Sequence, residues 1–156
     1  MKTTLLLIGK TTDSHVQALI DDYAARISHY MPFGVDIVAE PRGMANRDKR
    51  QVKDREGDAI MKHIEKGDYV VLLDEKGAEM SSNELAAWLQ KRLMAGRRTV
   101  FVIGGPYGFS RQVYDRADAK LSLSRLTFPH ELVRAIFAEQ LYRACTIIKG
   151  ESYHHE

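Results

Sequence analysis

The sequence contains very little cysteine and no apolar run long enough to cross a membrane. Cys145 is the only cysteine among 156 residues, so an internal disulfide is excluded and a reducing cytoplasm is the expected location. A membrane-spanning helix needs about 20 apolar residues, and no segment approaches that length. The apolar start, 1–9, has no basic segment and no small-residue cleavage site, which predicts a first strand rather than a signal peptide.

Several catalytic signatures are also missing. The glycine-rich segment 104–108 is not followed by Lys and then Ser or Thr, and it lacks the G-x-G-x-x-G spacing of dinucleotide sites. The G-x-S-x-G turn of hydrolases is absent as well. A zinc site needs several Cys or His residues at ligand spacing, which one cysteine does not provide. These absences argue against a phosphate-loop enzyme, a hydrolase and a zinc protein.

The composition is that of an ordinary folded protein. Hydrophobic residues make up 44% and charged residues 28%, which argues against disorder, and 156 residues suit one domain with a sizeable core. Segments of helical periodicity alternate with apolar runs, and the longest predicted helix begins at Pro129 and runs to about Lys149 before Gly150. This alternation predicts an α/β fold with a largely parallel sheet. The predicted strands are 2–8, 35–39, 69–73, 99–103 and 119–123.

Three predicted loops follow strands in the second half of the chain, at 73–77, 104–108 and 123–128. Ligands of open α/β sheets bind at the carboxyl ends of strands, which is where these loops lie. Glycine lets a backbone approach a ligand closely, so Gly104 and Gly105 fit a cofactor pocket. Taken alone, the two glycines favour an ordinary turn between a strand and a helix.

Positive charge is concentrated in the segment 41–55, where only Asp48 and Asp54 oppose six basic residues. Such a patch can contact phosphates. A solvated helix face with ion pairs four residues apart is the alternative interpretation. The basic residues are Arg42, Arg47, Lys49, Arg50, Lys53 and Arg55.

The second half of the sequence also carries a more specific pattern. VIGGPYG at 102–108 is followed by LSLSRLTFPH at 121–130, by VR at 133–134, by EQLYRA at 139–144, and by the pair Tyr153 and His154. In this order the segments resemble the RlmH family, the 23S ribosomal RNA pseudouridine N3-methyltransferases of the SPOUT class. The similarity extends over nearly the whole chain, including its small size and its opening strand.

The resemblance implies a fold, a cofactor and a substrate. The implied fold is an α/β/α sandwich with a parallel sheet and a C-terminal trefoil knot, forming one domain over 1–156 with the knot in about 70–150. The implied activity is methylation of N3 of pseudouridine 1915 in 23S rRNA of the assembled ribosome, with S-adenosylmethionine as cofactor, no metal, and a homodimer with cofactor sites near its interface. By position, the cofactor residues are Leu73, Gly104, Gly105, Leu123, Ser124, Arg125, Leu126, Thr127 and Phe128.

Elementary chemistry agrees with this assignment. Adenine needs a flat apolar slot, which Leu73, Leu123 and Leu126 can line, and exposed loop backbone can read its polar edge. A sulfonium is already an activated methyl donor, so the enzyme has mainly to align the methyl carbon with the target nitrogen. We expect Gly105→Val to block close backbone approach and to weaken cofactor binding.

Two further predictions concern the partners. Arg47, Lys49 and Arg50 are expected to contact RNA phosphates. The last helix has more apolar residues than one face needs, which predicts a dimer interface, although a fully buried helix is the alternative. Its apolar residues are Val133, Ile136, Phe137, Leu141, Ile147 and Ile148.

The tail is expected to turn from Gly150 towards the pocket and to lie over the substrate. Tyr153 can stack on a base, and His154 can exchange a proton with the target nitrogen. Tyr153 or solvent is the alternative proton acceptor, and a disordered terminus is the alternative structure.

Two other functions stay open at this point. The same fold can methylate transfer RNA, although the lack of an obvious separate RNA-binding domain favours a target whose surroundings help to dock the enzyme. An RNA-binding or nucleotide-binding module without catalysis is the second alternative, and the complete set of cofactor loops argues against it.

Overall fold

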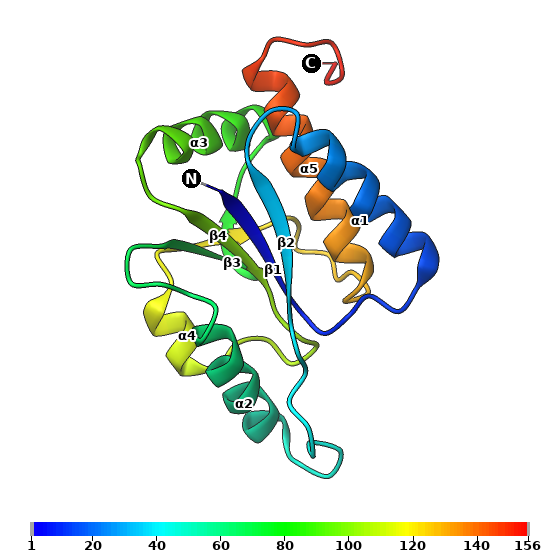
Figure 1. Ribbon diagram of the computed structural model, residues 1–156, viewed down its shortest axis with the longest axis vertical. Coiled ribbons are helices and arrows are strands. Elements are labelled where there is room, and N and C mark those ends of the chain that lie inside the picture. Colours follow the sequence, from blue (N-terminus) through cyan, green and yellow to red (C-terminus); the bar gives the residue numbers. More distant parts are fainter. Residues whose placement is uncertain (1, 156) are drawn as a thin grey trace.

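The computed structural model describes residues 2–155 and has a parallel sheet of five strands at its centre, in the order β2-β1-β4-β3-β5 (Figure 1). The predicted α/β fold with a parallel sheet is therefore confirmed, while the trefoil knot and the boundaries of its domain stay predictions. The strands are β1 (Thr3–Ile8), β2 (Phe33–Val38), β3 (Tyr69–Glu79), β4 (Thr99–Ile103) and β5 (Ala119–Ser122). The helices are α1 (Ser14–Ile27), α2 (Lys49–Met61), α3 (Ser82–Met94), α4 (Arg111–Arg116) and α5 (Leu132–Ile148).

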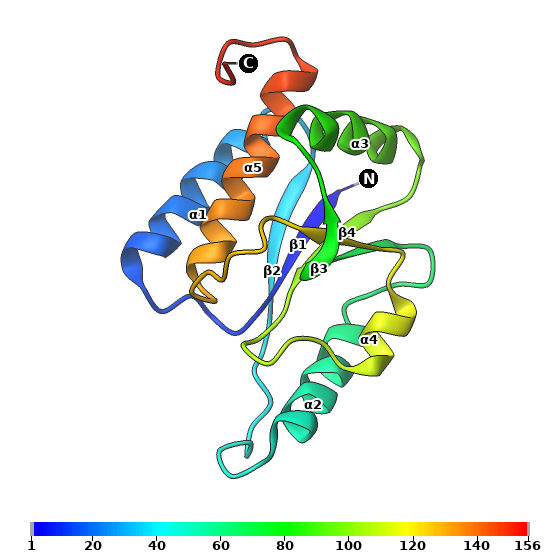
Figure 2. The same cartoon turned by 180° about the vertical axis from the view of Figure 1, so that it is seen from behind.

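Helices cover both faces of the sheet, as the view from behind in Figure 2 also shows. Helices α1, α3 and α5 lie on one face, where Phe101 of β4 packs against Phe137 of α5 with ring centroids 5.0 Å apart. Helices α2 and α4 lie on the other face, where Val102 belongs to a second core cluster with Ile60 and Val113. Strands buried on both faces read as continuous apolar runs. Because helices cover both faces of the sheet, a ligand can reach the sheet only at the ends of its strands.

The helix ends carry signals that can be read in the sequence. Ser81 and Glu84, three residues apart, form a capping box at the start of α3, since the Glu84 N–H donates to Ser81 Oγ at 3.1 Å and the Ser81 N–H donates to Glu84 Oε1 at 2.8 Å. Gly96 and Gly150 follow α3 and α5 with φ of 74° and 71°, the left-handed conformation that ends helices. Cys145 is 2% exposed, and burial raises the pKa of its thiol to about 11, so it packs as a small apolar residue.

One predicted turn has to be corrected. The segment 74–77 does not end β3 but bulges out of it, because Leu121 of β5 pairs first with Leu73 and then again with Ala78. A Cβ atom on Gly77 would lie 2.6 Å from the backbone carbonyl carbon of Lys120, so only glycine lets the strand return to β5. The bulge pushes Asp74 and its neighbours outward at the carboxyl end of the sheet.

Candidate functional site

A cleft of about 570 Å³ opens at the carboxyl ends of β3, β4 and β5, within the size range of small-molecule sites. Residues of all three predicted loops line this cleft, and so do His130 and Val133 near the start of α5. Arg125 is the one predicted cofactor residue that does not line the cleft, because its exposed guanidinium pairs with Glu79 at 3.5 Å. The predicted residues that line it are Leu73, Gly104, Gly105, Leu123, Ser124, Leu126, Thr127 and Phe128.

The apolar part of the cleft and its loop backbone suit a nucleoside. Leu73, Leu121 and Leu123 bring apolar side chains to the cleft from β3, β5 and the loop after β5. That loop is held in place by short-range hydrogen bonds. The Ser122 hydroxyl donates to the Ser124 carbonyl at 3.1 Å, and the Leu126 N–H donates to Ser124 Oγ at 3.0 Å. The backbone groups that would read an adenine edge are thus held before a ligand arrives.

The two glycines of the 104–108 loop are required by side chains behind the loop. A Cβ atom on Gly104 would lie 2.8 Å from the Phe109 ring, and one on Gly105 would lie 2.7 Å from Glu56 Oε2. Any side chain at either position must therefore displace the loop or its neighbours. The glycine loop is therefore a thin backbone wall of the cleft. A thin backbone wall and the apolar side chains of the same cleft together suit a nucleoside cofactor.

Glu56 is a buried carboxyl group that sequence reasoning missed. It lies on α2 against Gly105 and is 7% exposed. No hydrogen bond or ion pair from residues 2–155 reaches its carboxylate. Burial, and to a smaller extent the negative charge of Glu40, raises the pKa of Glu56 above its ordinary value.

The raised pKa predicts that Glu56→Gln stabilises the protein at neutral pH. In the wild type, the favourable contribution of the protonated carboxyl is complete below its unfolded-state pKa and is lost as the pH rises through the raised folded-state pKa. Glutamine keeps the shape without the charge. Thermal unfolding should therefore give the variant the higher Tm at pH 7 and an equal Tm in acid. Asp54→Asn, at an exposed position of the same helix, is the control; an unaltered pH profile for Glu56→Gln would contradict the assignment.

A tyrosine and an aspartate fix the outer wall of the cleft. Tyr114 of α4 donates a hydrogen bond from its hydroxyl to the Asp74 carboxylate of the β3 bulge. Burial and this hydrogen bond raise the pKa of Tyr114 to about 12, so the hydroxyl stays a donor at neutral pH. Both residues line the cleft. No signal in the sequence points to this pair, because Asp74 and Tyr114 are far apart in the chain.

The basic segment lies beside the mouth of the cleft. The Lys49 ammonium is 5.6 Å from the centroid of the Tyr107 ring in the glycine loop. A groove of about 640 Å³ next to α2 is lined by Arg42, Arg47 and Arg55, among others. None of the six basic residues of 41–55 forms an ion pair with another part of the described chain. The ion pairs of the alternative interpretation are therefore not found among the described residues, whereas a solvated helix face stays open.

The tail does not reach the cleft of its own chain. It lies beyond the last turn of α5, whereas the first turn of that helix lines the cleft (Figure 1), and 17 helical residues span roughly 25 Å. The expected turn towards the pocket is thus wrong within one chain. The expected alternative of disorder does not apply either, because the tail is packed against α5.

Specific contacts hold the tail on α5. The Tyr153 hydroxyl donates to Glu139 Oε2 at 2.7 Å, and its ring packs edge-on against Tyr142 at 4.7 Å. Burial and the bond to Glu139 raise the pKa of Tyr153. Arg143 donates to the same carboxylate at 2.7 Å and lies 3.0 Å from His154 Nδ1 through its other terminal nitrogen. Because a guanidinium only donates, His154 Nδ1 is the acceptor here.

A parallel α/β sheet with a nucleoside-sized cleft at its carboxyl edge is the architecture of a cofactor-binding α/β enzyme. A family model described as predicted SPOUT methyltransferase matches residues 1–154. The chain is also 47% identical over 157 residues to ribosomal RNA large subunit methyltransferase H of Bacteroides fragilis, with 100% of both chains covered. The corresponding protein of Christiangramia forsetii is 48% identical over 156 residues, with 99% of both covered.

This chain therefore belongs to the SPOUT methyltransferase family, and within it to the large subunit methyltransferase H group that its sequence resembles. SPOUT methyltransferases use S-adenosylmethionine. Within residues 2–155, no group of three or more His, Cys, Asp and Glu side chains is arranged to hold a metal ion. The helices of that same part of the chain are too short or too polar to span a membrane.

Proposed function

We propose that this chain methylates N3 of a pseudouridine in large-subunit ribosomal RNA, position 1915 of 23S rRNA, with S-adenosylmethionine in the cleft at the ends of β3, β4 and β5. The observation that carries the proposal is that eight of the nine cofactor residues expected from the sequence line one cleft. Relatives of the same length are named as methyltransferases of the large ribosomal subunit, which favours ribosomal over transfer RNA.

The cleft residues bind and orient the cofactor. Leu73, Leu123 and Leu126 would enclose the adenine, and the backbone of 123–128 would read its polar edge. Bound S-adenosylmethionine supplies an activated methyl group, so the protein has mainly to align it with the target nitrogen and exclude water. The wall formed by Asp74 and Tyr114 and the thin glycine loop hold that alignment from two sides.

The target imide must also lose its N3 proton. The raised pKa of Tyr153 and its hydrogen bond to Glu139 keep the phenol protonated, so we assign Tyr153 to stacking and positioning. His154 is the better proton acceptor, with solvent as the alternative. Its Nδ1 contacts Arg143, so accepting a proton there requires the tail to leave its resting place on α5.

A homodimer would bring the tail of one subunit near the cleft of the other. Phe137 and Leu141 are buried in the core of their own chain, whereas Val133, Ile136 and Ile147 of α5 remain partly exposed. These residues run along the helix from the cleft towards the tail. If two α5 helices pack antiparallel, each tail lies near the cleft of the partner, so the tail acts on substrate bound by the other subunit.

Methyl transfer from tritiated S-adenosylmethionine separates the candidate substrates. The purified chain should label ribosomes that lack this modification, and the label should reside in large-subunit RNA. Bulk transfer RNA and the small subunit serve as parallel acceptors. Label in transfer RNA alone would replace the proposed substrate, and no label in any RNA would favour a binding module without catalysis.

Reversing the charge of Arg47, Lys49 and Arg50 to Glu should reduce methylation of ribosomes at least tenfold and leave cofactor affinity unchanged. Phosphate contacts release counterions, so wild-type activity should fall as salt is raised, and the slope should be shallower in the variant. Exchanging Lys91, which lies in the last turn of α3, for Glu is the control. Normal activity and an unchanged salt slope in the triple variant would mean that the segment is only a solvated surface.

A further inference from the structure

Tyr107 is an exposed aromatic residue at the cleft that the mechanism does not use. Its side chain is 45% exposed, and it lines the cleft from the tip of the glycine loop. The other aromatic residues of the cleft are occupied. Phe109 is buried in the core, Tyr114 is bound to Asp74, and Phe128 is one of the expected cofactor residues. Within the described chain, the Tyr107 ring has a single recorded aromatic or cationic neighbour, the Lys49 ammonium.

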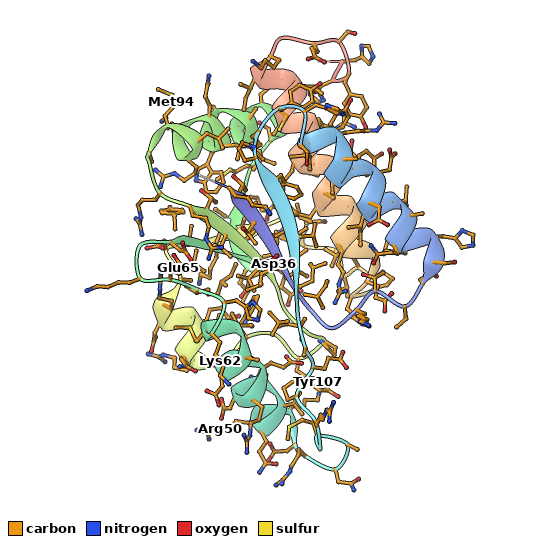
Figure 3. All side chains as sticks on the ribbon, viewed as in Figure 1. Asp36, Arg50, Lys62, Glu65, Met94 and Tyr107 are labelled. Carbon is orange, nitrogen blue, oxygen red and sulfur yellow. The ribbon has the colours of Figure 1, made fainter. Side chains whose placement is uncertain are left out.

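The position of Tyr107 joins two surfaces of different chemistry. On one side is the cleft proposed for the cofactor, and on the other is the start of α2 with the basic residues Arg47, Lys49 and Arg50. Figure 3 shows Tyr107 beside the segment that leads into α2. The loop that carries it closes in a turn, in which Gly108 has φ of 84° and its N–H donates to the Gly105 carbonyl at 3.3 Å. The turn places the ring between the cleft and the basic segment.

An aromatic ring beside lysine and arginine is how proteins hold single-stranded RNA. Bases stack on the ring while cations contact the neighbouring phosphates. An enzyme that modifies a base must expose that base from its stack, which leaves a face of the neighbouring base uncovered. On this basis, and resting on the proposed function, we propose that Tyr107 stacks on the nucleotide next to the target while Lys49 contacts the RNA backbone.

Steady-state methylation of ribosomes tests the stack. Tyr107→Ala and Tyr107→Leu should raise KM for ribosomes about tenfold, as the loss of one base stack implies, with little change in kcat or in S-adenosylmethionine affinity. Tyr107→Phe keeps the ring and should behave as the wild type. Met94→Ala removes an exposed side chain of α3 and is the surface control. Equal KM values for the Ala, Leu and Phe variants would overturn the proposal.

A second readout does not depend on activity. Replacing Tyr107 by the photo-crosslinker p-benzoylphenylalanine and irradiating the ribosome complex should give crosslinks within one or two nucleotides of the methylated base, about the reach of one stacked neighbour. The same replacement at Met94 should not crosslink there. Crosslinks from position 107 to a ribosomal protein or to the second subunit would overturn the stacking role. Failure of the wild type to methylate ribosomes, with crosslinks still mapped to RNA, would overturn the proposed function alone.

Discussion

Tyr153→Ala and His154→Ala should each lose most methyl transfer while the chain still dimerises and binds S-adenosylmethionine normally. Removing a proton acceptor costs about 10²- to 10⁴-fold in rate, and removing a stacked ring costs about 1–3 kcal/mol. We therefore expect the larger loss for His154→Ala. The measurement is single-turnover methylation of ribosomes, with cofactor affinity from calorimetry. Full activity after deletion of 152–156 would show that the proton acceptor lies elsewhere.

The proposed exchange of tails between subunits has its own test. A cleft-inactive chain and a tail-inactive chain are each inactive alone, and we expect a mixture of the two to regain activity, because a mixed dimer then has one intact cleft facing one intact tail. A tail acting in its own chain gives no recovery in the mixture. The resting contacts of Tyr153 and His154 with Glu139 and Arg143 predict that Glu139→Gln loosens the tail without changing cofactor affinity.

Gly105→Val should lower S-adenosylmethionine affinity by an order of magnitude or more. The first carbon of the new side chain would lie 2.7 Å from Glu56 Oε2, so either the buried carboxylate moves or the loop shifts into the cleft. Overpacking of this kind costs about 1–3 kcal/mol, which corresponds to a loss of about 5- to 150-fold in affinity. Unchanged affinity in a folded variant would mean that the cofactor does not use this loop.

Two companion variants make the result specific. Glu56→Ala in the Gly105→Val background should recover part of the affinity, because it removes the group that the valine meets. Gly67→Val is the matched glycine control, since a Cβ atom at Gly67 has nothing within 4 Å and its backbone has no left-handed conformation. A loss of affinity that Glu56→Ala does not relieve would indicate that the valine blocks the ligand itself, as the sequence alone suggested.

Local signals in the sequence predicted much of the fold. The capping box of Ser81 and Glu84 and the apolar run at 99–103 need only neighbouring residues, and both lie where the sequence put them. The three cofactor loops could be found because parallel strands end at one edge of their sheet. The same rule, together with the family pattern, predicts that the three loops line one cleft.

What the sequence did not predict depends on contacts between distant segments. Gly77 continues β3 as a bulge only because the backbone of β5 approaches it. Glu56 gives no local sign that it lies behind Gly105. The tail was expected over the pocket because Gly150 ends the helix, but the hydrogen bond from Tyr153 to Glu139 folds it back onto α5. In each case the deciding partner is remote in the chain or lies on another element.

Mass spectrometry of nucleosides and fragments from treated 23S rRNA can locate the proposed methyl group. Ribosomes that lack the modification are incubated with the chain and S-adenosylmethionine, and the large-subunit RNA is digested and sequenced by mass. We expect one new methyl group, on N3 of the pseudouridine at position 1915, and much less of it when the cleft variant Gly105→Val is used at the same limiting cofactor concentration and time. A methyl group on another nucleotide, or an RNA unchanged by the wild-type chain, would contradict the proposed function.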